Sequence, residues 1–204
     1  MKNDEKLSYF LNESKIINTE RLNKKVRIAV LGSFTFNGFE ETIRVKCFQN
    51  KIESKTYVAD YNQYNQDILK TDSKFYKFKP DITFLILDTR HILGDLFFTP
   101  YSLSDEEREK FTIEKVNEIN NLIRTVITNS KSHIIFSELQ IPTYSPYGIN
   151  EKTKNIGLKQ IVQKINDGIK DEVKKQQLVT IFDFNEFIQR YGENNVFNFK
   201  QFFS

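Results

Sequence analysis

The sequence has a single cysteine, Cys47, among its 204 residues. One cysteine excludes an internal disulfide framework and a cysteine-based metal cluster, and it fits a reducing compartment. Histidine is nearly as scarce, since only His91 and His133 occur. A serine nucleophile that needs a histidine base would therefore have to use one of these two.

Long apolar runs and a strong charge of one sign are also missing. No apolar run approaches the ~20 residues that span a bilayer, and the opening "MKNDEKLSYFLNESK" is too polar for a secretory signal. The net charge of +3 comes from 30 basic and 27 acidic residues scattered along the chain, which leaves no basic stripe for nucleic acid. We therefore expect a cytoplasmic soluble protein with one main domain and no membrane or nucleic-acid partner.

Five short apolar runs, rich in β-branched and aromatic residues, alternate with helical patterns. The runs predict buried parallel strands, and they read "VRIAVL", "KTYVAD", "ITFLILD", "SHIIFSEL" and "LVTIFDF". Apolar residues repeat at three and four over 113–127 and 158–173, and a shorter helix is expected over 39–49. This alternation predicts an α/β protein, a three-layer α/β/α sandwich with a mostly parallel five-stranded sheet.

Four loops follow the predicted strands and should meet at the carboxyl edge of the sheet, where such folds bind ligands. They read "GSFT", "DYNQYNQ", "DTRHI" and "ELQIPTYSPYG". In the first of them Ser33 is either a nucleophile or a turn residue, and its spacing is not the "GxSxG" of a nucleophile elbow. His91 lies in the right loop to act as its base. His133 opens the fourth strand, so we expect it at the amino edge.

The other polar residues of these loops leave ligand binding and structural pairing both open. Asp88 and Arg90 could bind a polar ligand or pair with each other. Glu138 lies next to the end of the fourth predicted strand and Asp183 within the fifth. Divalent-metal binding by these two residues has no spacing rule in its favour. The residues predicted to bind a ligand are Gly32, Ser33, Asp60, Tyr61, Asn62, Asp88 and Arg90, and we expect no metal in this chain.

The order of these motifs resembles the amino-terminal region of FkbH-like proteins. The resemblance covers about 26–192 and rests on "IAVLGSFT", "ADYNQYNQDIL", "FKPDITFLILDTRHI", "SELQIP", "IVQKINDGI" and "LVTIFDFNEFIQRYG". Such proteins are similar to phosphatases of the HAD superfamily, subclass IIIC, and load a glyceryl unit onto an acyl carrier protein in polyketide or surface-polysaccharide biosynthesis. The resemblance therefore implies a HAD domain in the same polypeptide and an acyl carrier protein as partners.

The chemistry of that family belongs to a carboxyl-terminal domain with a "DxDxT" signature and magnesium. This sequence has no such signature, because "DFNEF" supplies only Asp183. Magnesium is therefore implied only for a HAD domain that this chain lacks. We expect the chain to be an amino-terminal fragment or a stand-alone version, with a helical extension over 1–25, the main domain over 26–192 and an aromatic tail over 193–204. An exposed cluster of Phe197, Phe199, Phe202 and Phe203 would suit a docking segment.

The amino-terminal domain of FkbH-like proteins is in turn similar to SGNH, or GDSL-type, hydrolases with a flavodoxin-like fold. That similarity places Ser33 at the nucleophile position, Asp60 and Tyr61 where a glycine serves the oxyanion, and Arg90 in place of an asparagine. The final block, an aspartate and a histidine three apart, is missing after Asp183.

Three functions follow from these observations. The first is a docking or ligand-binding module that is not itself catalytic. The second is a stand-alone esterase or deacetylase that uses Ser33 with His91 as its base. The third, a nucleotide-binding Rossmann-type domain, lacks the three-glycine spacing.

Overall fold

The computed structural model describes residues 6–18 and 22–197, and its centre is a five-stranded parallel sheet. The strands pair in the order β2-β1-β3-β4-β5. Their bounds are β1 Lys24–Gly32, β2 Ile52–Val58, β3 Ile82–Ile86, β4 His133–Ser137 and β5 Val179–Phe182. The α/β class and the five-stranded parallel sheet expected from the sequence are thus confirmed.

The described chain packs as two compact units. One unit comprises the chain up to Ile86 together with Leu122–Ile135, and the other comprises Leu87–Asn121 and the chain from Phe136 onward. Helix α6 (Asp105–Asn129) contributes residues to both units.

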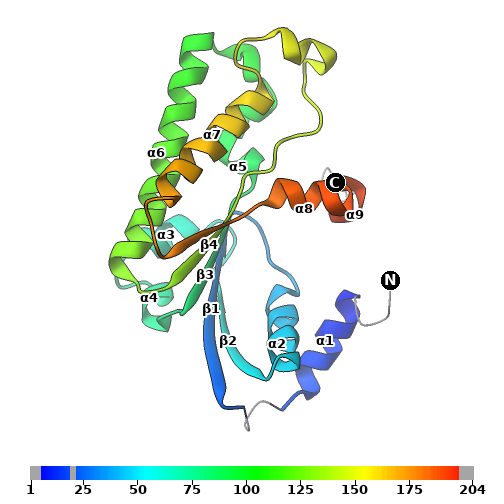
Figure 1. Cartoon of the computed structure of the whole chain (residues 1–204), viewed down its shortest axis with the longest axis vertical. Coiled ribbons are helices and arrows are strands. Elements are labelled where there is room, and N and C mark those ends of the chain that lie inside the picture. Colours follow the sequence, from blue (N-terminus) through cyan, green and yellow to red (C-terminus); the bar gives the residue numbers. More distant parts are fainter. Residues whose placement is uncertain (1–5, 19–21, 198–204) are drawn as a thin grey trace. The chain divides into compact units, whose positions relative to one another are not determined.

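In the first unit, β1 lies between β2 and β3 and supplies the centre of the core. Val30 pairs with Val58 on one side and with Phe84 on the other. Ala29, Val30 and Leu31 are fully buried, as expected for a strand that is covered on both faces. Figure 1 shows α1 and α2 on one side of these strands and α3 and α4 on the other. The helices are α1 Leu7–Ile16, α2 Phe39–Gln49, α3 Tyr64–Leu69 and α4 Lys74–Phe78.

The second unit is mostly helical, and the apolar stripe of α7 forms much of its core. Its helices are α5 Thr89–Leu93, η2 Gly94–Phe97, η3 Pro100–Ser102, the first part of α6, η4 Gly148–Thr153, α7 Leu158–Val173, α8 Phe184–Tyr191 and α9 Glu193–Val196. On α7 the core residues are fully buried at positions three and four apart, namely Leu158, Ile161, Val162, Ile165 and Ile169. The helices predicted at 39–49 and 158–173 are confirmed, and the third extends to Asp105–Asn129.

Two acidic residues, Asp88 and Asp183, were expected to belong to strands but cap helices in the structure. The third strand ends at Ile86, and the Asp88 carboxylate accepts the Arg90 N–H at the start of α5. Asp183 was expected within the fifth strand, but its carboxylate accepts the Glu186 N–H at the start of α8. Short carboxylates satisfy the free N–H groups of a first helical turn, and this preference ends both strands early.

The buried carboxylate of Glu151 ties down the long loop between β4 and α7. It accepts hydrogen bonds from the Tyr101 hydroxyl, from the Ser145 hydroxyl at 2.5 Å and from the Lys159 N–H at 3.0 Å. Burial alone would raise the pKa of Glu151, but these hydrogen bonds together hold the pKa below its usual value. A Cβ at Gly157 would lie 2.5 Å from a Glu151 carboxylate oxygen, so a larger residue there would force the Glu151 side chain to shift.

The predicted segments at the two ends are described in part. Helix α1 lies inside the segment expected as a helical extension, and the tail begins with α9 and Phe197. Phe199, Phe202 and Phe203 of the predicted aromatic cluster lie outside the described residues. Among the helices that are described, none is long and apolar enough to cross a membrane.

Candidate functional site

Ser33 and Gly32 lie where β1 ends, against the end of β3. The Ser33 N–H donates to the Ile86 carbonyl oxygen at 3.4 Å, and Ser33 is 3% exposed. A Cβ on Gly32 would lie 2.4 Å from that carbonyl oxygen and 2.5 Å from the Phe36 ring. The glycine is therefore required by the close approach of strand and aromatic ring. The Ser33 N–H therefore already donates a hydrogen bond to the backbone of the sheet.

His133 lies at the opposite end of the strands from Ser33. Its N–H donates to the Asp81 carbonyl oxygen at 2.9 Å, just before β3 begins, whereas Ser33 is bonded to Ile86 at the end of β3. Five residues of strand separate these points by about 16 Å. The amino-edge position expected for His133 is confirmed, and the other histidine, His91, is exposed on α5.

The loop after β2 forms a tight turn. The Ala59 N–H donates to the Val30 carbonyl oxygen, which holds the start of the loop beside β1. Asp60 and Tyr61 are exposed, and Asn62 has a φ of 55°, a left-handed conformation that asparagine tolerates better than most residues. Within the described part of the chain, the buried Oδ1 atom of Asn62 has no hydrogen-bond partner. It is thus an unused acceptor at the carboxyl edge of β2.

Asp88 and Arg90 form an ion pair with each other. Arg90 Nη2 lies 2.8 Å from Asp88 Oδ2, and the Arg90 N–H donates to Asp88 Oδ1 at 2.8 Å. Both side chains are about one quarter exposed. The structural pairing that the sequence left open is therefore present. It directs the Arg90 guanidinium towards Asp88, two residues earlier in the chain.

A polar pocket of about 320 Å³ opens in the second unit where β4 and β5 end. This is the edge at which parallel sheets bind ligands. Its floor is the buried Glu138 carboxylate, which lies 2.5 Å from Lys170 Nζ and accepts a 3.1 Å hydrogen bond from Asn185. The lining is almost entirely polar and consists of Glu138, Ile141, Gln163, Asn166, Lys170, Asp183, Asn185, Glu186 and Gln189.

Two asparagines fix the backbone at the rim of this pocket. Asn166 accepts the Leu139 N–H at 2.9 Å and donates to the Leu139 carbonyl oxygen at 2.8 Å. Asn185 accepts the Ile141 N–H at 2.9 Å. The hydrogen bond with Glu138 raises the pKa of Lys170 despite its partial desolvation. The ammonium thus stays protonated, and the pocket offers carboxylates, amides and one cation to a hydroxyl-bearing ligand.

The sequence identified Glu138 and Asp183 near this edge but missed Lys170, Asn166 and Asn185. Asn166 lies 27 residues from its partner Leu139, and no short-range pattern signals such a pairing. For Asn185 there was a weak signal. Asp183 and Glu186 have the Asp-x-x-Glu spacing that is typical of a helix start, and Asn185 lies between them. Among the described residues, no group of three or more His, Cys, Asp or Glu side chains could hold a metal ion.

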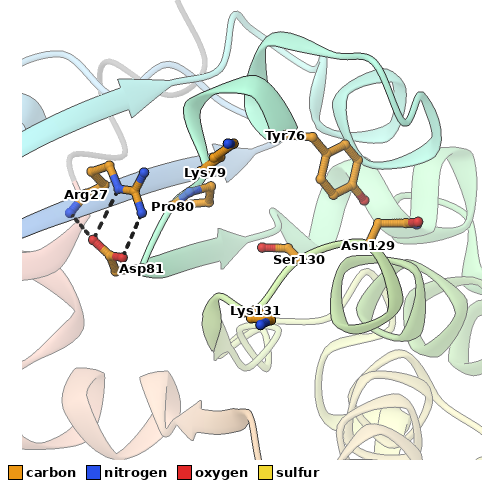
Figure 2. Close-up of a pocket in the computed structure, with 8 residues that line it drawn as sticks. All are labelled: Arg27, Tyr76, Lys79, Pro80, Asp81, Asn129, Ser130 and Lys131. Carbon is orange, nitrogen blue, oxygen red and sulfur yellow. Dashed lines mark hydrogen bonds and ion pairs between the residues drawn. The ribbon is translucent and has the colours of Figure 1, made fainter.

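A larger pocket of about 500 Å³ lies at the amino edge of the first unit. Figure 2 shows Arg27 joined to Asp81 there, with the Arg27 N–H donating to the same carboxylate at 2.7 Å. Lys79 follows the end of α4, and Lys131 lies two residues after the end of α6. Cations at helix carboxyl ends offset the partial negative charge of the free carbonyls. We therefore assign these charges to stability rather than to a ligand.

Solved structures of several hydrolases share this fold. The lipase Lip_vut3 from a goat rumen metagenome matches with a TM-score of 0.51 and 12% identity, covering 78% of this chain and 80% of that chain. The acetylxylan esterase Axe2 from Geobacillus stearothermophilus matches with a TM-score of 0.53 and 11% identity, covering 83% and 82%. At this identity the likeness shows the fold alone, that of the SGNH-like α/β hydrolases.

The family follows from the sequence. The family model described as FkbH, N-terminal domain, matches residues 27–204. The chain therefore belongs to the FkbH N-terminal domain family, as its motifs indicated. No curated protein matches it.

The solved structure of a longer protein matches nearly the whole length of this chain. This is the N-terminal part of the protein BF1531 from Bacteroides fragilis, described as containing a phosphatase domain complexed with Mg. The match has a TM-score of 0.79 and 16% identity and covers 95% of this chain. This chain covers 49% of that one, about half its length.

Proposed function

We propose that this chain is the amino-terminal module of a larger polypeptide with a HAD-type, subclass IIIC phosphatase domain, and that it docks partners or binds ligand rather than catalysing a reaction. The observation that carries the proposal is membership of the FkbH N-terminal domain family over 27–204. The Bacteroides fragilis neighbour supports it, because its phosphatase domain accompanies a matching half. An acyl carrier protein would be the partner, in polyketide or surface-polysaccharide biosynthesis, and magnesium would belong to the phosphatase domain.

The surroundings of Ser33 support a non-catalytic role. A serine needs an adjacent base to become a nucleophile, and His133 lies at the opposite end of the strands. An oxyanion also needs donors aimed at it. The Ser33 N–H is bonded to Ile86, and Arg90, at the position where SGNH hydrolases carry an asparagine donor, is paired with Asp88.

A second candidate function is a serine esterase or deacetylase. It is favoured by the position of Ser33 at the end of β1 in a hydrolase-like fold. This function requires His91 to act as the base. Acetylated sugars or carrier-linked acyl groups would be its substrates.

Labelling with a fluorophosphonate probe separates the two candidates. The probe reacts with activated serines, so we expect no labelling of the 204-residue chain and no turnover of p-nitrophenyl acetate above the buffer rate. Ser33→Ala should leave both results unchanged. Ser102→Ala, at an exposed serine of η3, is the matched control. Labelling that persists in Ser102→Ala and disappears in Ser33→Ala would establish the esterase and overturn the proposal.

A further inference from the structure

The polar pocket at the ends of β4 and β5 has a floor on which a hydrogen-bond acceptor and a donor lie side by side. Glu138 is 3% exposed, and its Oε1 atom lies 2.5 Å from Lys170 Nζ. Within the described residues, no donor other than Lys170 reaches this oxygen. A carboxylate oxygen can accept two hydrogen bonds, and an ammonium can donate three. The floor therefore has both acceptor and donor capacity left for a ligand.

Two buried or partly buried amides hold this floor in place. The Asn185 amide donates to Glu138 Oε2 at 3.1 Å and to the Leu139 carbonyl oxygen at 3.1 Å. Asn166 is 2% exposed, and both ends of its amide are bonded to the backbone of Leu139. Binding groups that are fixed before a ligand arrives lower the entropic cost of binding. These amides therefore position the floor, and contact with a ligand is left to Glu138, Lys170 and the rim.

The rim of the pocket adds further acceptors and one amide. Asp183 and Glu186 each have one carboxylate oxygen that makes no hydrogen bond in the described part of the chain. Gln189 is exposed on α8 and makes no hydrogen bond with the described residues. Its amide can both donate and accept. The pocket thus has more open acceptors than open donors, which suits a ligand that is rich in hydrogen-bond donors.

The composition of the pocket excludes several classes of ligand. The three carboxylates of Glu138, Asp183 and Glu186 oppose one ammonium, so the formal charge of the lining is −2 and repels phosphate and carboxylate groups. Ile141 is the one apolar residue in the described lining, which gives an acyl chain or an aromatic ring little to pack against. The carboxylates do not form a group that could hold a metal ion. An uncharged polar molecule remains.

We infer that this pocket binds a small, uncharged, polyhydroxylated molecule, a sugar or polyol, through Glu138, Lys170 and Gln189. The inference rests on the proposed function in its ligand-binding role, and it gives that role a site outside the residues predicted from the sequence to bind a ligand. A hydroxyl both donates and accepts through one oxygen, so neighbouring hydroxyls match the adjacent acceptor and donor of the floor. An amine would meet the charge of Lys170 and leave its N–H groups without an acceptor. A volume of about 320 Å³ is enough for one small ligand.

Saturation-transfer difference NMR with the 204-residue chain tests the inference, because the method detects weakly bound small molecules. The probes, each added alone, are glycerol, sorbitol, myo-inositol, D-glucose, D-galactose, D-mannose and D-xylose. We expect at least one of them to bind, and its phosphate monoester to bind at least about tenfold more weakly because the pocket is negatively charged. The inference is overturned if none of these probes binds, or if only spermidine or the phosphate monoesters bind.

Matched variants test whether the binding takes place in this pocket. Lys170→Met removes the donors of the floor and should weaken binding at least about tenfold. Lys164→Met is the control, because Lys164 lies on the same helix and also pairs with a carboxylate at 2.5 Å, that of Glu109, but does not line the pocket. Binding to the control should be unchanged. A folded Lys170→Met variant that binds as tightly as the unaltered protein would place the ligand elsewhere and overturn the inference.

Gln189→Ala decides the matter if Lys170→Met does not fold. Gln189 is exposed and takes part in no ion pair of the described residues, so its replacement should leave the fold intact. We expect it to weaken binding about threefold, as the loss of one uncharged hydrogen bond would. Unchanged binding in this variant, with Lys170→Met unfolded, would contradict the inference.

The inference and the proposed function fail separately. Absence of binding by every uncharged probe leaves the proposed function standing, because that function rests on membership of the family over 27–204. Labelling of Ser33 by the fluorophosphonate probe, or a native polypeptide without a phosphatase domain, would overturn the proposed function whether or not a polyol binds.

Discussion

Replacing Glu151 by glutamine should destabilise the protein at neutral pH. The carboxylate receives three donors, namely the Tyr101 and Ser145 hydroxyls and the Lys159 N–H. A glutamine keeps one acceptor oxygen and sets an NH₂ donor against at least one of these donors. Hydrogen bonds to a charged group contribute about 1.5–3 kcal/mol each. Because Tyr101 and Ser145 can turn to water, we expect a loss of about 2–3 kcal/mol in total.

Urea unfolding followed by far-ultraviolet circular dichroism measures this loss. With an m value of about 2 kcal/mol/M, the midpoint should fall by about 1–1.5 M at pH 7. The pKa of Glu151 is lowered in the folded state, so its contribution is present above the unfolded pKa and is lost as the pH falls through the folded pKa. The difference between Glu151→Gln and the unaltered protein should therefore shrink as the pH falls below about 4.

Glu106→Gln is the control, because Glu106 is exposed in the first turn of α6. Its free energy of unfolding should differ from that of the unaltered protein by less than about 0.5 kcal/mol. An unchanged midpoint for Glu151→Gln at pH 7 would refute the role of Glu151 in holding the loop. The role would also be refuted if Glu151→Gln lost as much stability at pH 3 as at pH 7.

Two further predictions concern the first unit. Gly32→Ala forces a methyl group against the Ile86 carbonyl oxygen, which cannot move unless β3 moves with it. The free energy of unfolding should therefore fall by about 3 kcal/mol. A change below about 0.5 kcal/mol in urea unfolding would contradict this packing. Burial, and the hydrogen bond of Tyr57 to Asp67 at 2.7 Å, raise the pKa of the Tyr57 hydroxyl. Stability from this group is therefore present at pH 9 and lost as the pH rises through the raised pKa. The pKa of Tyr101 is raised in the same way, by burial and by its hydrogen bond to Glu151. In alkaline titration at 295 nm, Tyr57→Phe should therefore remove one of the tyrosines that ionise late, and removal of an early one would contradict the assignment.

Much of the fold could be predicted because the central strands β1, β3 and β4 are buried or partly buried on both faces along most of their length. Runs such as Val26–Leu31 contain few polar residues, and their length and β-branched content separate them from helices. Helices α2 and α7 follow from apolar repeats that the structure buries. Helix α8 was missed, because its Phe-rich sequence has modest helix propensity and continues the apolar run of the fifth strand. The strand ends at Phe182 because Asp183 caps α8, and the apolar pattern of the run does not show this.

The candidate site was harder to predict from the sequence. The loops that follow the strands could be located from the sequence, since strand polarity alone determines them. That these loops bind a ligand stays a prediction. The contact of Lys170 on α7 with Glu138 was not predicted. The position of Lys170 on the helix brings it to Glu138, and no local sequence motif signals this contact. For Asp88 and Arg90 the sequence left pairing and ligand binding open, and the geometry shows the pairing.

The measurement that tests the central claim most directly is the mass of the native polypeptide in its source cell, by immunoprecipitation and peptide mapping of its carboxyl end. The account predicts a product well above the 24.2 kDa of this chain, with peptides from a segment that contains a "DxDxT" signature. A product of about 24 kDa that lacks those peptides would contradict it. Ser33 would then be the first residue to test for activity.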